Sequence, residues 1–413
     1  MPQPSTKYTA KNTELADQNI PSHADAGASA RSPETGAKVL FFSGGSALYG
    51  LSRTLKQYTH NSIHMITPFD SGGSSAVIRD AFDMPALGDY RHRMMALADE
   101  NVDGQTKVYK LFNYRLPKDA TQVDLQAELL TLQRGEAPLI AAVEAAIREV
   151  IIGYLTDFIA AMPPEFDLRG ASIGNLVLAG GYLHHGRDLR KILTLFADIL
   201  GVQGRVCTVT DESLHLAVTL QDGRELVGQH VFTGKETGEI DSPVQSMRMV
   251  TSIEQPNSAS CHLPEGERAT IMGADLICFP PGSFYSSLLA NLLPKGVGCA
   301  ICDSPAPKVF IPNAGCDPEQ FGMSVSDQID TLLTYIEQDC EDGAFCVNKA
   351  LNYVVIDSTN DRLTSQVPRE RLAKQGVEII ECALTKMSAH TDPNLKPYYD
   401  NQILSRVLLS LAS

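Results

Sequence analysis

The chain has 413 residues, of which 43% are hydrophobic and 20% charged, so it can bury a large core and is typical of a soluble globular protein. Lys and Arg total 34 against 49 Asp and Glu, which gives a net charge of −15. This negative charge disfavours nucleic acid and anionic membranes as partners. A phosphate-bearing ligand would therefore need a local nest.

The first 36 residues, 1–36, are rich in Ser, Ala, Thr, Asp and Pro without apolar periodicity. They are predicted to form a disordered tail. No apolar signal segment opens the chain, so the expected location is cytoplasmic. The longest hydrophobic stretch, Pro138–Met162, carries too many charges to span a bilayer and is predicted to be an amphipathic core helix.

The globular part is predicted to begin with a strand, a glycine turn and a helix. The apolar run Val39–Phe42 gives way to Ser43–Ser46, and Leu48, Leu51 and Leu55 then recur at helical spacing. A second unit follows, with a strand over His64–Thr67, a loop over Asp70–Ser75 and a helix from Ala76. A third turn, Gly88–Asp89, precedes a helix that runs through Leu97.

The middle of the chain changes character. Helices are predicted from Asn175 and over 188–200, and three short alternating segments follow at Arg205–Thr210, His215–Leu220 and Glu225–Phe232. These strands predict a small antiparallel appendage within about 202–270.

The first pattern then resumes. A strand over Ala274–Phe279 leads into the loop Pro280–Ser283 and a helix over Phe284–Leu293, and further strands are predicted over 308–311, 353–356 and 377–380. The sequence thus predicts an α/β fold over 37–413: a Rossmann-like, doubly wound, mostly parallel sheet with a smaller α+β subdomain.

Ligands of an open parallel sheet bind at the carboxyl ends of its strands, where three glycine- and serine-rich loops are expected here. Glycine lets the backbone approach a ligand, and free amides at the following helix favour an anion. The loops Ser43–Ser46 and Pro281–Ser283 are therefore predicted to hold a diphosphate. A single glycine turn often serves packing alone, but three in series favour a site. Neither the dinucleotide fingerprint nor a P-loop is present, which disfavours NAD and ATP.

Several charged residues near these loops are candidates for chemistry. Asp70 ends a short strand, where a carboxylate suits Mg²⁺ binding or the polarisation of a substrate hydroxyl. The alternative is an Asx turn or a helix cap, and Asp89 has the same two interpretations. Arg79 and Arg91 are candidates for a phosphate clamp, with surface ion pairs as the alternative.

Taken in order, these motifs resemble those of the CofD/YvcK family, which comprises 2-phospho-lactate transferases and gluconeogenesis factors. The likeness spans about Lys38 to the C-terminus. The matching segments are Phe42–Leu48, Asp70–Ser75, Pro85–Arg91, Gly174–Leu176 and Pro281–Leu293. The chain departs from the family pattern at Ala47, at Ser71, which replaces an aspartate, and at Ala76, so it resembles a divergent branch.

The resemblance implies a Rossmann-like core that binds a nucleoside-diphosphate-linked small molecule. In CofD, a phospho-lactyl or phosphoenolpyruvyl group passes from a guanosine diphosphate-linked donor to a deazaflavin hydroxyl with Mg²⁺. In YvcK proteins the site holds UDP-N-acetylglucosamine and serves regulation without turnover. The chain is expected to act in one of these ways, and a homodimer is expected.

The expected roles follow from the loops and the resemblance together. Asp70 is the expected catalytic residue and the candidate Mg²⁺ ligand. The expected ligand-binding residues are Ser43, Gly44, Gly45, Ser46, Gly72, Gly73, Ser74, Ser75, Asp89, Arg91, Asn175, Gly282 and Ser283.

Overall fold

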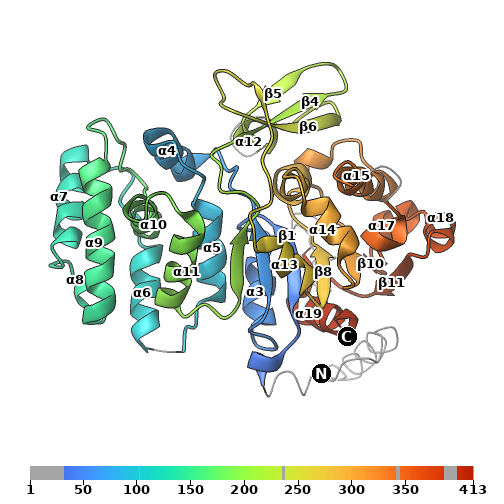
Figure 1. The fold of residues 1–413 in the computed structure, drawn as a ribbon, viewed down its shortest axis with the longest axis horizontal. Helices are drawn as coiled ribbons and strands as arrows, with labels where there is room; N and C mark the ends of the chain where they lie inside the picture. The colour runs from blue at the N-terminus through green and yellow to red at the C-terminus, as the bar shows by residue number, and fades with distance from the viewer. Residues whose placement is uncertain (1–31, 102, 235–237, 341–344, 386–397, 413) are drawn as a thin grey trace, which may run out of the picture.

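The computed structural model of the chain describes residues 32–101, 103–234, 238–340, 345–385 and 398–412 (Figure 1). Most of the predicted tail, residues 1–31, lies outside these ranges. Its last residues include a short 3-10 helix, η1 (Pro33–Thr35). Within the described ranges, no helix combines the length and the apolar character that a membrane crossing requires.

Seven parallel strands form the central sheet, in the order β11-β10-β9-β8-β1-β2-β3. In that order they are Glu378–Cys382, Tyr353–Asp357, Lys308–Phe310, Leu276–Phe279, Val39–Ser43, Ile63–Ile66 and Arg205–Thr208. The chain proceeds from β1 outward to β2 and β3, and β8 then adds on the other side of β1. The sheet therefore has its topological switch point between β1 and β8. The predicted doubly wound α/β fold is confirmed.

Helices cover the sheet and also form a separate lobe (Figure 1). Before the appendage they are α3 (Tyr49–Leu55), α4 (Gly73–Phe82), α5 (Gly88–Leu97), α6 (Asp103–Asn113), α7 (Gln122–Gln133), α8 (Pro138–Ala141), α9 (Ala145–Ala161), α10 (Ile173–His184) and α11 (Leu189–Leu200). Later ones are α12 (Gln229–Phe232), α13 (Glu267–Met272), η2 (Phe284–Leu288), η3 (Leu289–Leu292), α14 (Val297–Asp303), η4 (Pro318–Gln320), α15 (Val325–Glu337), α16 (Val347–Ala350), α17 (Asp361–Gln366), α18 (Arg369–Lys374) and α19 (Asn401–Leu411).

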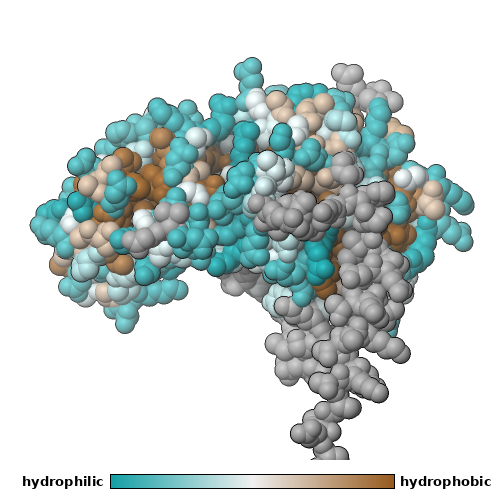
Figure 2. All heavy atoms as spheres, turned by 90° about the horizontal axis from the view of Figure 1, so that it is seen from below, coloured by the Kyte–Doolittle hydropathy of each residue, from teal (hydrophilic) through white to brown (hydrophobic). Residues whose placement is uncertain are grey.

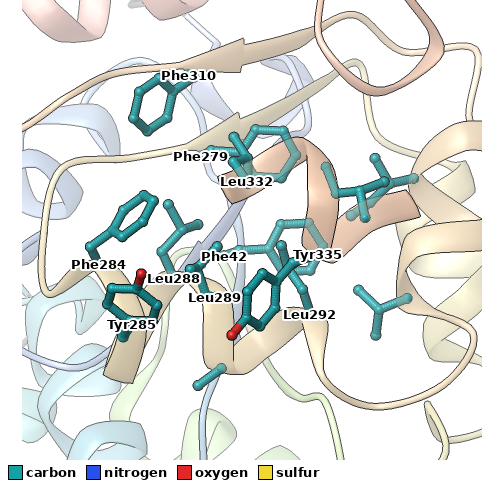
Figure 3. Close-up of a cluster of buried hydrophobic side chains, with 14 of the residues drawn as sticks. Phe42, Phe279, Phe284, Tyr285, Leu288, Leu289, Leu292, Phe310, Leu332 and Tyr335 are labelled. Carbon is teal, nitrogen blue, oxygen red and sulfur yellow. The ribbon is translucent and has the colours of Figure 1, made fainter. Parts of the chain in front are cut away.

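Alternate residues of the central strand β1 pack into different layers. Val39 and Phe41 belong to the core cluster that includes α3 and α19, whereas Leu40 and Phe42 belong to the cluster on the other face. Figure 3 shows Phe42 beside Phe279 of β8, and their rings stack with centroids 5.9 Å apart. This packing fixes the ends of β1 and β8, the two strands on either side of the switch point.

The helical lobe, α5 to α11, packs around its own core. The single helix predicted over Pro138–Met162 is wrong in one detail, because Glu144, with φ −54° and ψ 142°, leaves the helical conformation and separates α8 from α9. Seen from below, this lobe shows hydrophobic side chains at its surface (Figure 2). Val123 of α7 is 75% exposed.

The appendage is a four-stranded antiparallel sheet in the order β5-β4-β6-β7, with bounds Glu225–Val227, His215–Leu220, Val244–Val250 and Ser258–Ala259. The assignment of Arg205–Thr210 to it is wrong, because β3 pairs in parallel with β2 at the edge of the main sheet. Alternation along a strand does not reveal which sheet it joins. The strand predicted over Glu225–Phe232 ends at Val227, because Gly228 has a φ of +94° and α12 follows.

Candidate functional site

The loop that follows β1 forms one wall of a cavity of about 120 Å³ at the switch point. Gly45 lies against Asp89: a Cβ on Gly45 would stand 2.8 Å from Asp89 Cγ and 2.9 Å from its Cα. A Cβ on Gly44 would stand 2.5 Å from Ser287 Oγ. Both glycines are therefore required by close packing. Among the described residues, none accepts a hydrogen bond from the amides of Gly45, Ser46 or Ala47, so these amides are available to an anion.

Arg93, a buried arginine that the sequence analysis did not identify, contacts this loop from the interior of the protein. The side chain of Arg93 is fully buried; its Nη2 donates to the carbonyl of Gly44 at 2.9 Å and its Nη1 donates to Ser52. Burial lowers the pKa of Arg93 to about 10, which leaves the guanidinium charged at neutral pH. The loop thus carries a fixed positive charge beneath free amides, an arrangement that favours a bound phosphate.

The loop that follows β8 approaches from the other side of the cavity. Gly282 has a φ of +152°, and Asn313 holds it with two hydrogen bonds: Gly282 N donates to Asn313 Oδ1 at 2.8 Å, and Asn313 Nδ2 donates to the Gly282 carbonyl at 2.7 Å. Asn313 follows β9 and was not among the predicted site residues.

The expectation of free amides at the helix start after this loop is wrong. Phe284 N donates to Asp317, and Tyr285 N and Ser286 N both donate to Glu319, each at 2.8 Å. These two carboxylates cap η2 and would repel an anion placed there. They also account for the replacement of the predicted helix over Phe284–Leu293 by a π-helix and a 3-10 helix, since the chain is fixed by partners outside it.

The second loop places Asp70 at the border of the cavity. Gly72 N donates to Asp70 Oδ1 at 3.2 Å, so the Asx-turn interpretation describes the local geometry, and Asp70 Oδ2 lies near Gly88. The helix α4 begins at Gly73, three residues earlier than predicted. Arg79 donates to the carbonyls of Asp70 and Leu214, at 3.1 and 2.6 Å. It therefore holds the loop in place, and its prediction as a phosphate clamp is wrong.

Ser71 connects this loop to the appendage. Its Oγ lies 2.9 Å from Nδ1 of His230 and accepts a hydrogen bond from the backbone amide of His230 at 3.2 Å. The neighbouring Gln229 lines the cavity. Helix α12 therefore attaches the four-stranded sheet to the site, a contact between residues 159 positions apart that local sequence patterns do not reveal.

A second cleft, of about 580 Å³, adjoins the cavity, and the two share Asp70, Asp89 and Gln229. On its floor the Nε of Arg91 donates to Asn175 Oδ1 at 2.7 Å, and both side chains are buried. The absence of a side chain at Gly174 permits this contact, because a Cβ would stand 2.8 Å from Arg91 Cδ. Burial lowers the pKa of Arg91 to about 10, with a further contribution from Arg115.

All of the predicted site residues line one or both of these hollows. The first cavity contains Ser43, Gly44, Gly45, Ser46, Gly282 and Ser283; the cleft contains Gly72, Gly73, Ser74, Ser75, Arg91 and Asn175; and Asp70 and Asp89 border both. The structure thus brings together residues from five separate segments. Their binding roles remain predictions. The residues that sequence reasoning missed include Arg93, Gln229, His230, Asn313, Asp317 and Glu319.

The comparisons with known proteins decide the family. The profile of the family described as 2-phospho-L-lactate transferase CofD matches residues 39–385. The chain belongs to the CofD family. The putative gluconeogenesis factor of Thermotoga maritima is 27% identical over 346 residues, covering 83% of this chain and 85% of that protein. The gluconeogenesis factor of Bacillus subtilis is 28% identical over 296 residues, covering 71% and 74%. The predicted CofD/YvcK membership is confirmed.

A solved structure agrees with this assignment at the level of the fold. A protein of the UPF0052 family from Bacillus halodurans superposes with a TM-score of 0.63 and 20% identity, covering 91% of this chain and 99% of that chain. At this identity the likeness shows a shared fold alone.

Proposed function

We propose that this chain binds a nucleoside-diphosphate-linked small molecule with its diphosphate on the loop after β1. The observation that carries the proposal is the combination of three free amides, at Gly45, Ser46 and Ala47, with the buried charge of Arg93 beneath them. The loop lies at the switch point of a doubly wound sheet, where such ligands bind in other proteins. The matched family is described as 2-phospho-L-lactate transferase CofD, which is consistent with a phosphate-bearing ligand.

Calorimetry with GDP, UDP and their sugar conjugates, with and without Mg²⁺, tests the proposal. A ligand that binds the native state raises its stability in proportion to the logarithm of its concentration, so thermal unfolding gives an independent measurement. We expect binding with a raised Tm for at least one nucleotide series. If no nucleoside diphosphate binds or raises the Tm, the proposal is wrong.

Magnesium fits the same site. Mg²⁺ is commonly held by one or two carboxylates together with substrate phosphates, and Asp70 and Asp89 both border the cavity. Within the described ranges no cluster of three or more His, Cys, Asp or Glu side chains could hold a metal by itself. We therefore propose that Asp70 and Asp89 would hold Mg²⁺ only together with the diphosphate, where the ion would neutralise phosphate charge.

In the catalytic form of the proposal, Asp70 orients an acceptor hydroxyl for attack on the distal phosphorus of the ligand. The bond from that phosphorus to the bridging oxygen breaks, a nucleoside monophosphate leaves with that oxygen, and the proton of the hydroxyl passes to solvent. The contribution of the chain is positioning and charge neutralisation. Asp70→Asn keeps an oxygen that can accept from Gly72 N, so we expect nucleotide binding measured without Mg²⁺ to persist while turnover is lost. Full turnover by this variant would remove Asp70 from the mechanism.

The second candidate is a ligand sensor that releases its ligand unchanged. The contact between Ser71 and His230 favours it, because this contact connects the loop bordering the cavity to the appendage. A multiple-turnover assay with an acceptor alcohol distinguishes the two candidates, since only a transferase accumulates nucleoside monophosphate. The homodimer also stays a prediction, which sedimentation velocity would test.

A further inference from the structure

The wall of the cleft beyond Asp70 and Asp89 carries a group of basic side chains that the diphosphate loop does not use. Arg91 forms the buried floor, and Arg115 and Lys118 stand at the exposed rim. The chain as a whole has 34 basic and 49 acidic residues, whereas the lining of this cleft carries four Arg and Lys side chains against three carboxylates, those of Asp70, Asp89 and Asp167. Basic side chains gathered on one wall of a cleft attract a ligand group of opposite charge.

The backbone places these cations firmly. Residues 114–118 run beside 170–173 in a short antiparallel contact: Leu116 N donates to the Ala171 carbonyl at 2.9 Å and Gly170 N to the Leu116 carbonyl at 3.0 Å. Arg115 Nη1 donates to the Gly170 carbonyl at 3.0 Å. The stem of Lys118 lies over Gly170, where a Cβ would stand 3.2 Å from Lys118 Cε.

The same side chains are not neutralised within the protein. Among the described residues, no carboxylate forms an ion pair with Arg91, Arg115 or Lys118. The fourth cation of the cleft, Arg169, differs, because it pairs with Asp167 at 2.8 Å. No described residue accepts a hydrogen bond from Arg91 Nη2. These charges also affect a neighbour: burial, followed by Arg91, Arg93 and Arg115, lowers the pKa of His92 to about 4.

We propose that Arg91, Arg115 and Lys118 form a second anion subsite, which selects ligands whose far end carries a carboxylate or phosphate. The inference rests on the proposed function, because it assumes that the diphosphate occupies the loop after β1. The adjoining hollows allow one ligand to reach both places, since Asp70, Asp89 and Gln229 border each of them. The cleft volume of about 580 Å³ lies within the range usual for small-molecule sites.

The test compares two ligands that differ in one group. UDP-glucose ends in a neutral hydroxymethyl where UDP-glucuronic acid has a carboxylate, and GDP-mannose and GDP-mannuronic acid form the matching guanine pair. We expect the wild-type chain to bind the carboxylated member of the accepted pair about tenfold more tightly, because charge-assisted hydrogen bonds are stronger than neutral ones.

The variant is Arg115→Gln/Lys118→Gln, in which the first substitution keeps an amide donor for the Gly170 carbonyl. We expect it to lose this preference while its affinity for the neutral conjugate changes less than about twofold. The control is Lys349→Gln/Arg406→Gln, which removes the same charge from exposed positions on α16 and α19 and should retain the preference. Thermal unfolding of each variant verifies folding.

The outcomes separate the two proposals. If no nucleotide conjugate binds the wild-type chain, the proposed function fails and this inference fails with it. If the conjugates bind without a preference for the carboxylate, or if the double variant keeps the preference, only the anion subsite is overturned. A preference that disappears in the variant and persists in the control supports the subsite.

Discussion

Adding a single methyl group at Gly45 should damage the diphosphate loop while the fold persists. In Gly45→Ala the new Cβ would stand 2.3 Å from Asp89 Oδ1 and 2.9 Å from Asp89 Cα, and ordinary contacts begin at 3.4 Å. Even with the carboxylate turned away, the loop must therefore retreat from the Asp89 backbone by about 0.5 Å. Such a shift lengthens an amide–phosphate hydrogen bond from about 2.9 Å to the limit of useful geometry. Loss of one such bond to a charged group costs about 1.5–3 kcal/mol, which corresponds to roughly ten- to hundredfold weaker nucleotide binding.

Calorimetry with the nucleoside diphosphate that binds best measures this loss, and thermal unfolding measures the stability. The matched control is Gly153→Ala in the middle of α9, where a Cβ would meet no atom within 4 Å. Alanine is the better helix former by about 0.5–1 kcal/mol, so the control should be slightly stabilised and bind normally. Unchanged affinity in Gly45→Ala would refute the placement of the diphosphate on this loop.

Three further predictions concern neighbouring residues. The pKa of His92 is lowered to about 4, so the folded state binds fewer protons than the unfolded state; stability should be lost as the pH falls from about 6.5 to about 4. Because His92 is partly exposed, the free energy of unfolding lost on its protonation is about 1–2 kcal/mol. The free energy of unfolding of His92→Gln, measured in urea, should therefore depend less steeply on pH than that of the wild-type chain. Asn313→Ala removes both hydrogen bonds to Gly282 and should cost about 1–2 kcal/mol in urea unfolding; an unchanged midpoint would contradict the clamp. Ser71→Ala separates the loop from His230, so amide hydrogen exchange in α12 should accelerate, and unchanged protection would disprove the connection.

The sequence predicted the strands and turns of the site because their signals are local. An apolar run such as Val39–Phe42 followed by Gly44 and Gly45 indicates a buried strand and a tight turn without knowledge of the rest of the chain. The convergence of the loops then follows from the general geometry of parallel sheets. For this reason every predicted site residue lines one of the two hollows.

The residues that sequence reasoning missed are of two kinds. Some contact partners that are distant in the sequence, and one is a charged residue that is buried although such residues usually lie at the surface. Asp317 and Glu319 cap the amides of η2 from positions about thirty residues away, and no short motif announces such a partnership. Arg93 lies two positions after Arg91 on α5, where a charged side chain is normally assigned to solvent. Its burial becomes visible only when Ser52 and the Gly44 carbonyl are placed around it.

These long-range contacts make the two walls of the cavity electrostatically unequal. On the β1 side, free amides lie over the charge of Arg93, whereas on the β8 side the amides of Phe284 to Ser286 are already bound to carboxylates. A diphosphate should therefore lie on the loop after β1. Gly282 would contribute only room for the ligand, because it has no side chain. The far end of the ligand would then pass Asp70 toward Arg91. A complex with the diphosphate at the start of η2 would contradict this arrangement.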